Sequence, residues 1–150
     1  MKKLLILVVV ICSSVNLMAH SGTEINEKVK ASFKATFPDA SDVKWHETGN
    51  TYLVRFLRNG IDTRVEYDIE GFILRTTRYY DQKSLPAFLL SKLNKKFSDK
   101  KIHLITEVTN EEGMEYYISL YDQKKWYMVK ASSNGSLEVY DKYNRQQEVN

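Results

Sequence analysis

Cysteine is almost absent from this sequence. The single cysteine, Cys12, lies in an N-terminal segment that we expect to be removed. The mature chain then has no disulfide framework and no cysteine nucleophile. Proline and glycine are also scarce, with two and six residues, and the glycines stand singly instead of forming a phosphate-binding loop. The stability of the fold must therefore come from side-chain packing.

The one long apolar run lies at the N-terminus. Two lysines precede an apolar stretch over residues 4–12, and a more polar exit ends at Ala19. This order is typical of a cleaved secretory signal, and the run is too short to anchor a chain in a bilayer. We predict that residues 1–19 are a signal peptide and that the mature protein is periplasmic or secreted, with no transmembrane segment. The alternative is lipidation of Cys12, which the bulk of Ile11 disfavours.

An excess of charge of one sign is also lacking. The full chain carries a formal net charge of +3, but two of its 22 basic residues lie in the predicted signal, which leaves 20 against 19 acidic residues. Such a chain has no strongly basic surface for the phosphates of a nucleic acid. The composition therefore predicts neither a nucleic-acid partner nor an anionic membrane surface as partner.

Apolar residues recur every four positions in two segments that lie 60 residues apart. This spacing is typical of the buried stripe of an amphipathic helix. The residues are Ile25, Val29, Phe33 and Phe37 in the first segment and Leu85, Leu89, Leu93 and Phe97 in the second. Because hydroxyl side chains are preferred N-caps, we expect Ser21 or Thr23 to cap the first helix and Ser84 the second.

Alternating apolar and polar residues, the pattern of strands with two unlike faces, follow each helix. The clearest case is the run over residues 51–67, where Asn59-Gly60 favours a tight hairpin turn. The same pattern returns 64 residues later. We predict an α+β fold, a tandem repeat of one helix plus four antiparallel strands with both helices packed on one face of the sheet. Residues 20–150 would form one domain with sub-repeats 24–80 and 84–143.

Several turn and core motifs in the first half form a recognisable set. They are Phe37-Pro38-Asp39-Ala40, Val43-Lys44-Trp45, Gly49-Asn50, and Tyr67-Asp68 followed by Gly71. With these motifs the mature chain resembles the PepSY-like proteins exported by Bacteroidetes, a family related in fold to β-lactamase inhibitor protein. The resemblance implies a helix-plus-sheet repeat whose open sheet face could bind another protein, and it implies no catalytic residues.

The strand pattern predicts a set of large side chains on the sheet face that the helices leave uncovered. The set consists of Tyr117, Tyr121, Trp126, Met128 and Tyr140. Tyrosine and tryptophan supply large, rigid contact areas and are enriched in binding hot spots. We therefore predict that these residues bind a partner. The alternatives are cross-strand packing that only stabilises the sheet, or a register one residue away that would bury the whole set.

Arginines gather in the first half of the chain. Arg55 and Arg64 are expected on the same open face as Glu66. We count the two arginines among the candidate partner-binding residues, because guanidinium groups bind carboxylates well. The alternative, cross-strand ion pairs on a solvated face, is the more ordinary use of such residues.

Motifs for catalysis or metal binding are missing. His46 and His103 lack the spacing of a metal site, and there is no G-x-S-x-G motif. We predict no enzyme activity, no metal and no cofactor. The first hypothesis is a binding protein that docks another protein through the open face, with inhibition of an exported enzyme as one form. Envelope glycan or small-ligand binding by the same aromatic residues is the alternative, and the oligomeric state stays open.

Overall fold

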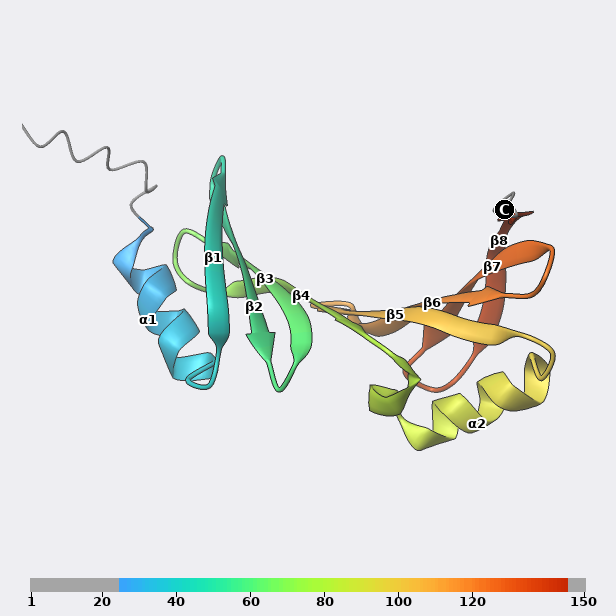
Figure 1. The fold of residues 1–150 in the computed structure, drawn as a ribbon. Coiled ribbons are helices and arrows are strands. Elements are labelled where there is room, and N and C mark those ends of the chain that lie inside the picture. The colour runs from blue at the N-terminus through green and yellow to red at the C-terminus, as the bar shows by residue number, and fades with distance from the viewer. Residues whose placement is uncertain (1–24, 146–150) are drawn as a thin grey trace, which may run out of the picture.

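The structure, a computed structural model, describes residues 25–145. The predicted signal peptide and Cys12 lie outside these residues. A helix followed by four strands occurs twice in the chain order (Figure 1). The elements are α1 (Glu27–Thr36), β1 (Ser41–Thr48), β2 (Thr51–Arg58), β3 (Ile61–Asp68), β4 (Ile73–Tyr80), the short 3-10 helix η1 (Gln82–Ser84), α2 (Ala87–Lys96), β5 (Lys101–Asn110), β6 (Gly113–Tyr121), β7 (Lys125–Ser132) and β8 (Leu137–Asn144). Within residues 25–145, no helix has the length and apolar character needed to cross a membrane.

All eight strands form one antiparallel sheet in the order β1 to β8, so each strand pairs with its sequence neighbours. The register decides which face each helix covers, because directly paired residues share a face. Phe56 pairs with Thr63, Thr63 with Arg78, Arg78 with Glu107, and Glu107 with Tyr116. Phe56 packs in the cluster under α1 and Tyr116 in the cluster under α2. Both helices therefore lie on one face, and we call the opposite one the open face. The predicted α+β class with an antiparallel sheet and two helices is confirmed.

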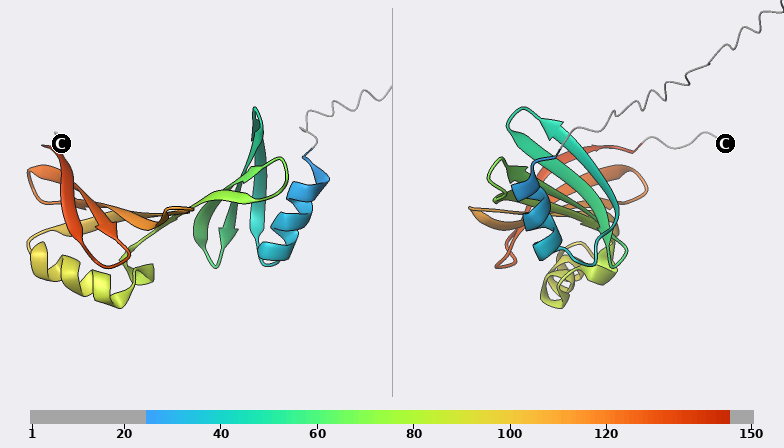
Figure 2. Two further views of the ribbon diagram at one scale, coloured as in Figure 1. Left: turned by 180° about the vertical axis from the view of Figure 1, so that it is seen from behind. Right: turned by 90° about the vertical axis from the view of Figure 1, so that its left-hand side faces the viewer.

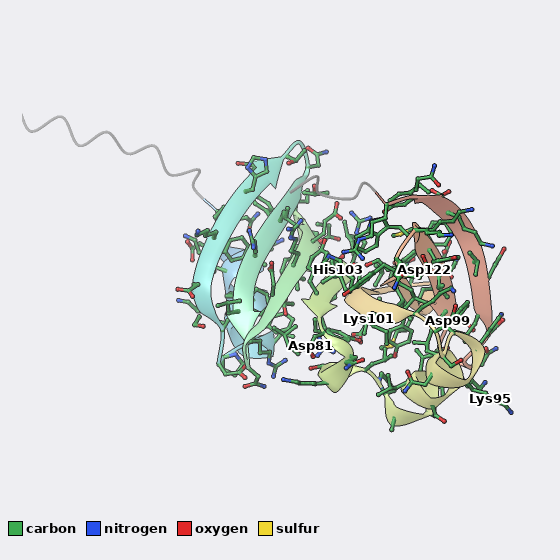
Figure 3. The ribbon with its side chains drawn as sticks, turned by 45° about the vertical axis from the view of Figure 1, so that its right-hand side comes forward. Asp81, Lys95, Asp99, Lys101, His103 and Asp122 are labelled. Carbon is green, nitrogen blue, oxygen red and sulfur yellow. The ribbon has the colours of Figure 1, made fainter. Side chains whose placement is uncertain are left out.

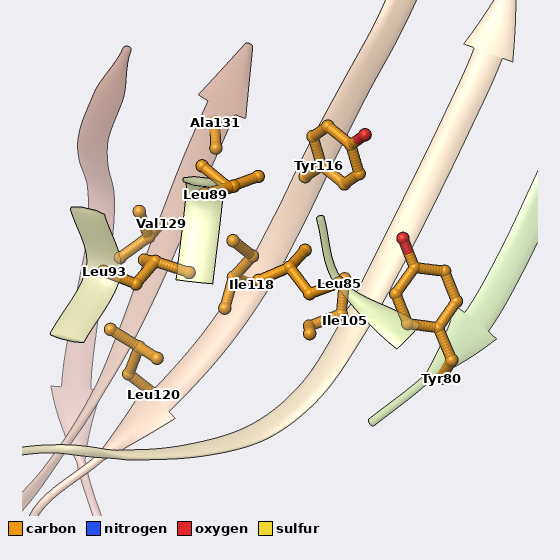
Figure 4. Close-up of a cluster of buried hydrophobic side chains, with 10 residues drawn as sticks. All are labelled: Tyr80, Leu85, Leu89, Leu93, Ile105, Tyr116, Ile118, Leu120, Val129 and Ala131. Carbon is orange, nitrogen blue, oxygen red and sulfur yellow. The ribbon is translucent and has the colours of Figure 1, made fainter. Parts of the chain in front are cut away.

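The hydrophobic core is divided into two clusters, one under each helix. The first contains Ile25, Val29, Phe33, Phe37, Tyr52, Val54, Phe56, Val65 and Tyr67. The second contains Tyr80, Leu85, Leu89, Leu93, Ile105, Tyr116, Ile118, Leu120, Val129 and Ala131 (Figure 4). Figures 1 and 2 show α1 at one end of the molecule and α2 at the other, with the twisted sheet running between them.

Glu107 on β5 is a buried carboxylate on the same face of the sheet as the two helices. Glu107 is 6% exposed, and its Oε2 accepts a hydrogen bond of 2.6 Å from the Tyr80 hydroxyl. Its Oε1 accepts one of 3.0 Å from Arg78. Burial and the bond to Glu107 raise the pKa of Tyr80 well above its ordinary value. Because both oxygens have hydrogen-bond partners, the carboxylate can stay buried on this face of the sheet.

The helix starts differ from the predicted hydroxyl caps. Asn26 caps α1 by accepting a hydrogen bond of 2.8 Å from the Lys28 N–H. Ser21 and Thr23, the residues predicted for this role, lie outside the described residues. The prediction that Ser84 caps α2 is wrong, because Pro86 occupies the cap position without a side-chain bond. Instead, the Asp81 side chain accepts a hydrogen bond from the Lys83 N–H and caps η1, the short helix that contains Ser84.

Two glycines allow turns to approach the helices. Gly71 in the β3–β4 turn has φ +88°, and a Cβ there would lie 3.0 Å from the Lys28 carbonyl oxygen of α1. Gly135 in the β7–β8 turn has φ +83°, and a Cβ there would meet the Lys92 side chain of α2 at 2.6 Å. Both turns thus depend on a residue that adopts positive φ without strain.

Candidate functional site

The structure places all seven predicted site residues on the open face. Arg55 and Arg64 lie between buried residues of β2 and β3, and Tyr117 does so on β6. The aromatic residues and Met128 gather on β6–β8, whereas the two arginines lie on β2 and β3 at the other end of the sheet. The predicted residues therefore lie in two groups on this face.

Trp126 is the centre of the larger group. Its ring centroid lies 5.0 Å from that of His103, 5.2 Å from that of Tyr121 and 6.4 Å from that of Tyr143, which is stacked at 24°. The Arg145 guanidinium lies 4.4 Å from the Tyr121 ring centroid. We call His103, Tyr121, Trp126, Tyr143 and Arg145 the aromatic cluster. It combines flat apolar surface with a cation that prefers aromatic faces.

Sequence reasoning missed His103, Tyr143 and Arg145. The β5–β6 register shifts between Ile102 and Leu104, and His103 lies in this irregularity. The β7–β8 register shifts after Met128, and this brings Tyr143 opposite Trp126. Alternation counted from a regular strand cannot find such residues, although an excess of aromatic residues near the chain end was a usable signal.

A second, smaller group lies beside the aromatic cluster on the same face. The rings of Tyr117 and Tyr140 meet edge to face at 6.1 Å. Glu115 accepts a hydrogen bond of 2.9 Å from the Tyr117 hydroxyl and pairs with Lys130 at 2.7 Å. The hydrogen bond with Lys130, and then the one from Tyr117, lower the pKa of Glu115. These contacts hold Tyr117 in one orientation, while Tyr140 stays 49% exposed.

Asp122 orders the β6–β7 turn between Tyr121 and Trp126. Its Oδ1 accepts 2.8 Å hydrogen bonds from the backbone N–H groups of Lys124 and Lys125, and its Oδ2 accepts one of 2.7 Å from the Tyr127 hydroxyl. These bonds lower the pKa of Asp122 to about 2, with the Lys124 N–H the largest cause. The turn therefore holds the two central rings of the aromatic cluster at a fixed spacing.

A hollow of about 470 Å³ opens beside the aromatic cluster. Its lining includes Tyr121, Arg145, Asp99, Lys101 and Asp122. Asp99, Lys101 and Asp122 are labelled in Figure 3, which shows them at the same end of the sheet as His103. The lining mixes both signs of charge with one aromatic ring. Within residues 25–145, no three histidine or acidic side chains gather closely enough to hold a metal ion.

The arginines at the other end of the open face differ from one another. Arg55 forms a bidentate ion pair with Asp62, in which its Nε donates to Oδ1 at 3.0 Å and its Nη2 to Oδ2 at 2.7 Å. Arg75 pairs with Glu66 at 2.8 Å. These two arginines follow the ordinary use as cross-strand ion pairs. Arg64 forms no such ion pair within residues 25–145. Its guanidinium lies over the Tyr79 ring, 4.7 Å from the ring centroid.

Comparison with solved structures identifies the fold. A BLIP-like protein from Bacteroides fragilis matches with a TM-score of 0.67 and 16% identity over 87% of this chain and 94% of that chain. A DUF2874 family protein from Bacteroides ovatus matches with a TM-score of 0.62 and 18% identity, covering 82% and 89%. A candidate periplasmic protein from Bacteroides eggerthii matches with a TM-score of 0.61 and 22% identity, covering 79% and 87%. At these identities the likeness establishes a shared fold, and it confirms the predicted resemblance to BLIP-like Bacteroidetes proteins.

Sequence comparison adds one relative. An uncharacterised protein from Methanocaldococcus jannaschii is 28% identical over 101 residues, which cover 63% of this chain but only 26% of that protein. The chain thus spans about a quarter of the length of this relative. No family model matches the chain.

Proposed function

We propose that this protein is an exported, non-enzymatic binding module that docks another protein against its open sheet face. The aromatic cluster carries this proposal. Trp126 lies among three other rings on a face that neither helix covers, and Tyr143 beside it is 49% exposed. Tryptophan, tyrosine and arginine are the residues most enriched in binding hot spots.

The position of the cluster favours binding over a purely structural role. Tyr143 lies on β8, an edge strand, so its ring has a neighbouring strand on one side alone. Aromatic rings placed for stability gain most when they are buried, as Phe56 is in the α1 cluster. The shared fold with a BLIP-like protein supports one form of the proposal, inhibition of an exported enzyme. The predicted signal peptide supports a periplasmic or secreted location.

The test is affinity capture from the envelope fraction of the producing cell, with the mature protein as bait. Trp126→Ala/Tyr143→Ala removes the centre and the exposed edge of the cluster. Phe88→Ala is the matched control, because Phe88 on α2 is also 49% exposed but lies on the helix side. We expect one protein to be held by the wild type and by Phe88→Ala and lost by the double variant.

Measurement with the purified partner completes the test. The double variant should weaken binding by roughly 30-fold or more, the loss that a hot-spot residue causes. An unchanged thermal midpoint would show that the fold is intact. If the double variant binds like the wild type, or if no protein is captured, the proposal fails.

Binding of an envelope glycan or small ligand is the second candidate, and the 470 Å³ hollow beside Tyr121 favours it. Its charged lining could bond to hydroxyl groups while the ring contacts a sugar face. However, Arg145 already lies over the Tyr121 ring, which leaves less of it for stacking. Thermal-shift screening against envelope sugars separates the candidates, because a bound ligand raises apparent stability by mass action.

We also infer that the chain consists of two sub-repeats, 24–80 and 84–143, within one domain. The bounds of α1 and α2 differ by 60 positions, and those of β3 and β7 by 64. Trp45 and Trp126 lie in different halves, so variants that keep a single tryptophan report on each half. If the two sub-repeats form one domain, tryptophan fluorescence and far-UV circular dichroism of each variant should give the same urea midpoint, and different midpoints by the two probes in one variant would contradict it.

A further inference from the structure

A second hollow lies near the middle of the open face, away from the aromatic cluster. It has a volume of about 360 Å³, and four strands line it. The lining residues are Leu53, Arg64, Glu66, Arg75, Thr77, Tyr79, Thr106 and Val108. Its edge adjoins the binding face proposed above, since Thr106 pairs directly with Tyr117. A protein seated on the aromatic residues of β6 would therefore extend over this hollow.

The charges around the hollow are unequally compensated. Arg75 has Glu66 as its partner, and the neighbouring Arg55 has Asp62. Arg64 has no acidic partner among residues 25–145, and its Nε is buried without a hydrogen-bond acceptor. The hollow thus contains two guanidinium groups and one carboxylate. Its surplus positive charge belongs to Arg64.

The Arg64 side chain is also held in place. Its guanidinium lies over the Tyr79 ring, 4.7 Å from the centroid. A guanidinium fixed in this way loses less freedom when it binds an anion, and its planar fork matches the two oxygens of a carboxylate. Because the Nε–H group is enclosed by protein atoms, an anion would bind the terminal nitrogens of the guanidinium.

We propose that the hollow receives the carboxylate of an aspartate or glutamate side chain of the protein partner, with Arg64 as its anchor. This proposal rests on the proposed function, because it names the chemistry by which the same partner is recognised. The Thr77 hydroxyl lies in the same lining and can donate a further hydrogen bond. Charge complementarity selects an acidic side chain, since one carboxylate balances the charge of Arg64.

The test uses two capped peptides, Ac-Gly-Glu-Gly-NH2 and Ac-Gly-Gln-Gly-NH2, which differ in charge but hardly in shape. Nitrogen-15 NMR of the arginine Nε–Hε groups follows the titration, and Arg64→Gln identifies the Arg64 signal by its loss. We expect the Glu peptide to shift this signal and to saturate it at a concentration of roughly a few millimolar. The Gln peptide should leave it unchanged.

The matched control is Arg58→Gln, which removes the same charge from a neighbouring arginine that already has a carboxylate partner, Asp39, and does not line the hollow. This variant should bind the Glu peptide like the wild type, whereas Arg64→Lys should bind it at least fivefold more weakly. The backbone NMR spectrum of each variant checks its fold. The proposal is overturned if both peptides shift the Arg64 signal equally, or if neither does.

A second arm separates this proposal from the proposed function. With the captured partner, Arg64→Gln should lower the affinity about tenfold, while Arg58→Gln should leave it unchanged. If Arg64→Gln binds the partner like the wild type, the hollow does not serve the partner, although docking on the aromatic cluster stands. If the Trp126→Ala/Tyr143→Ala variant binds like the wild type, the proposed function fails, and the peptide titration still decides whether Arg64 binds carboxylates.

Discussion

The two halves of the molecule share one order of elements but place their aromatic residues differently. Under α1 the core is rich in rings, with Phe33 centred 5.2 Å from Trp45 and 5.1 Å from Phe56. Under α2 the core is mostly aliphatic. On the open face the difference is reversed, because the first half carries ion pairs and the second half carries the aromatic cluster.

The core positions of the two halves correspond more closely than the positions on the open face. Leu120 occupies the position in the second half that Phe56 occupies in the first, 64 residues earlier, and each is 1% exposed. Either side chain fills the space between helix and sheet, so the core tolerates both chemistries. The face opposite the helices is not packed against a helix, so its side chains are not required to fill the two core clusters.

The largest expected effect comes from truncating the matched core positions. Phe56→Ala should cost about 3–5 kcal/mol and Leu120→Ala about 2–5 kcal/mol, since each leaves a cavity. The loss at Phe56 should be the larger, because its ring centroid lies 5.1 Å from that of Phe33 and 4.9 Å from that of Phe37. Urea unfolding at constant m-value measures both. The exposed Phe88→Ala should stay within about 0.5 kcal/mol, and a comparable loss there would contradict the burial argument.

Two buried hydroxyl groups should respond in opposite directions. Tyr80→Phe removes the 2.6 Å hydrogen bond to Glu107 and should cost about 1.5–3 kcal/mol, as for bonds to charged groups. Tyr67→Phe removes a buried hydroxyl that has no partner in residues 25–145 and should stabilise the protein by up to about 1 kcal/mol. Thermal unfolding of the pair at pH 7 is the measurement. Equal signs would show that the two hydroxyl environments are not distinct.

The stability of the protein at high pH should depend on the ionisation of Tyr67. Burial raises the pKa of Tyr67 from 10.0 to about 12. A folded pKa above the unfolded one means a contribution to stability that is complete below pH 10 and lost as the pH rises through about 12. The wild type should therefore lose more stability than Tyr67→Phe over this range, and parallel curves would refute the assignment.

The two glycine turns should differ in their tolerance of a methyl group. Gly71→Ala places a Cβ 3.0 Å from a backbone carbonyl, so the turn must move, and we expect a loss of about 2 kcal/mol. Gly135→Ala meets the end of the flexible Lys92 side chain, which can turn away, and about 1 kcal/mol of backbone strain remains. Urea midpoints of the two variants give the comparison, and a greater loss at Gly135 would reverse it.

The smallest effect concerns the turn that carries the aromatic cluster. The folded pKa of Asp122, about 2, lies below its ordinary value of 3.8. Its contribution to stability is therefore present above pH 4 and lost as the pH falls toward 2. Asp122→Ala should be less stable than the wild type at pH 6, and the difference should shrink between pH 4 and 2. A difference that does not change with pH would exclude the carboxylate as its source.

Much of the fold follows from short-range patterns in the sequence. The four-residue spacing of apolar side chains predicted both helices, and alternation placed Tyr117 and Arg55 on the open face, because side chains of a regular strand alternate between faces. Asn59-Gly60 predicted the β2–β3 turn, where both residues have positive φ. These features depend on neighbours within a few residues.

The features that were missed depend on irregular or distant contacts. His103 and Tyr143 join the aromatic cluster through register shifts, which alternation cannot foresee. The uncompensated charge of Arg64 follows from which arginine on neighbouring strands meets which carboxylate, and several pairings fit the same sequence. The start of α2 was misplaced because the side chain of Asp81, and not Ser84, organises the approach to the helix.

The unbroken strand order has a consequence for how the chain reaches its fold. Within residues 25–145, every strand pairs with its neighbours in the sequence, and no strand pairs with a distant part of the chain. Loop closures are then short and their entropic cost is low, which favours rapid folding. A chain that is synthesised from its N-terminus can therefore pair each new strand with the strand before it, so that the next strand covers each exposed edge.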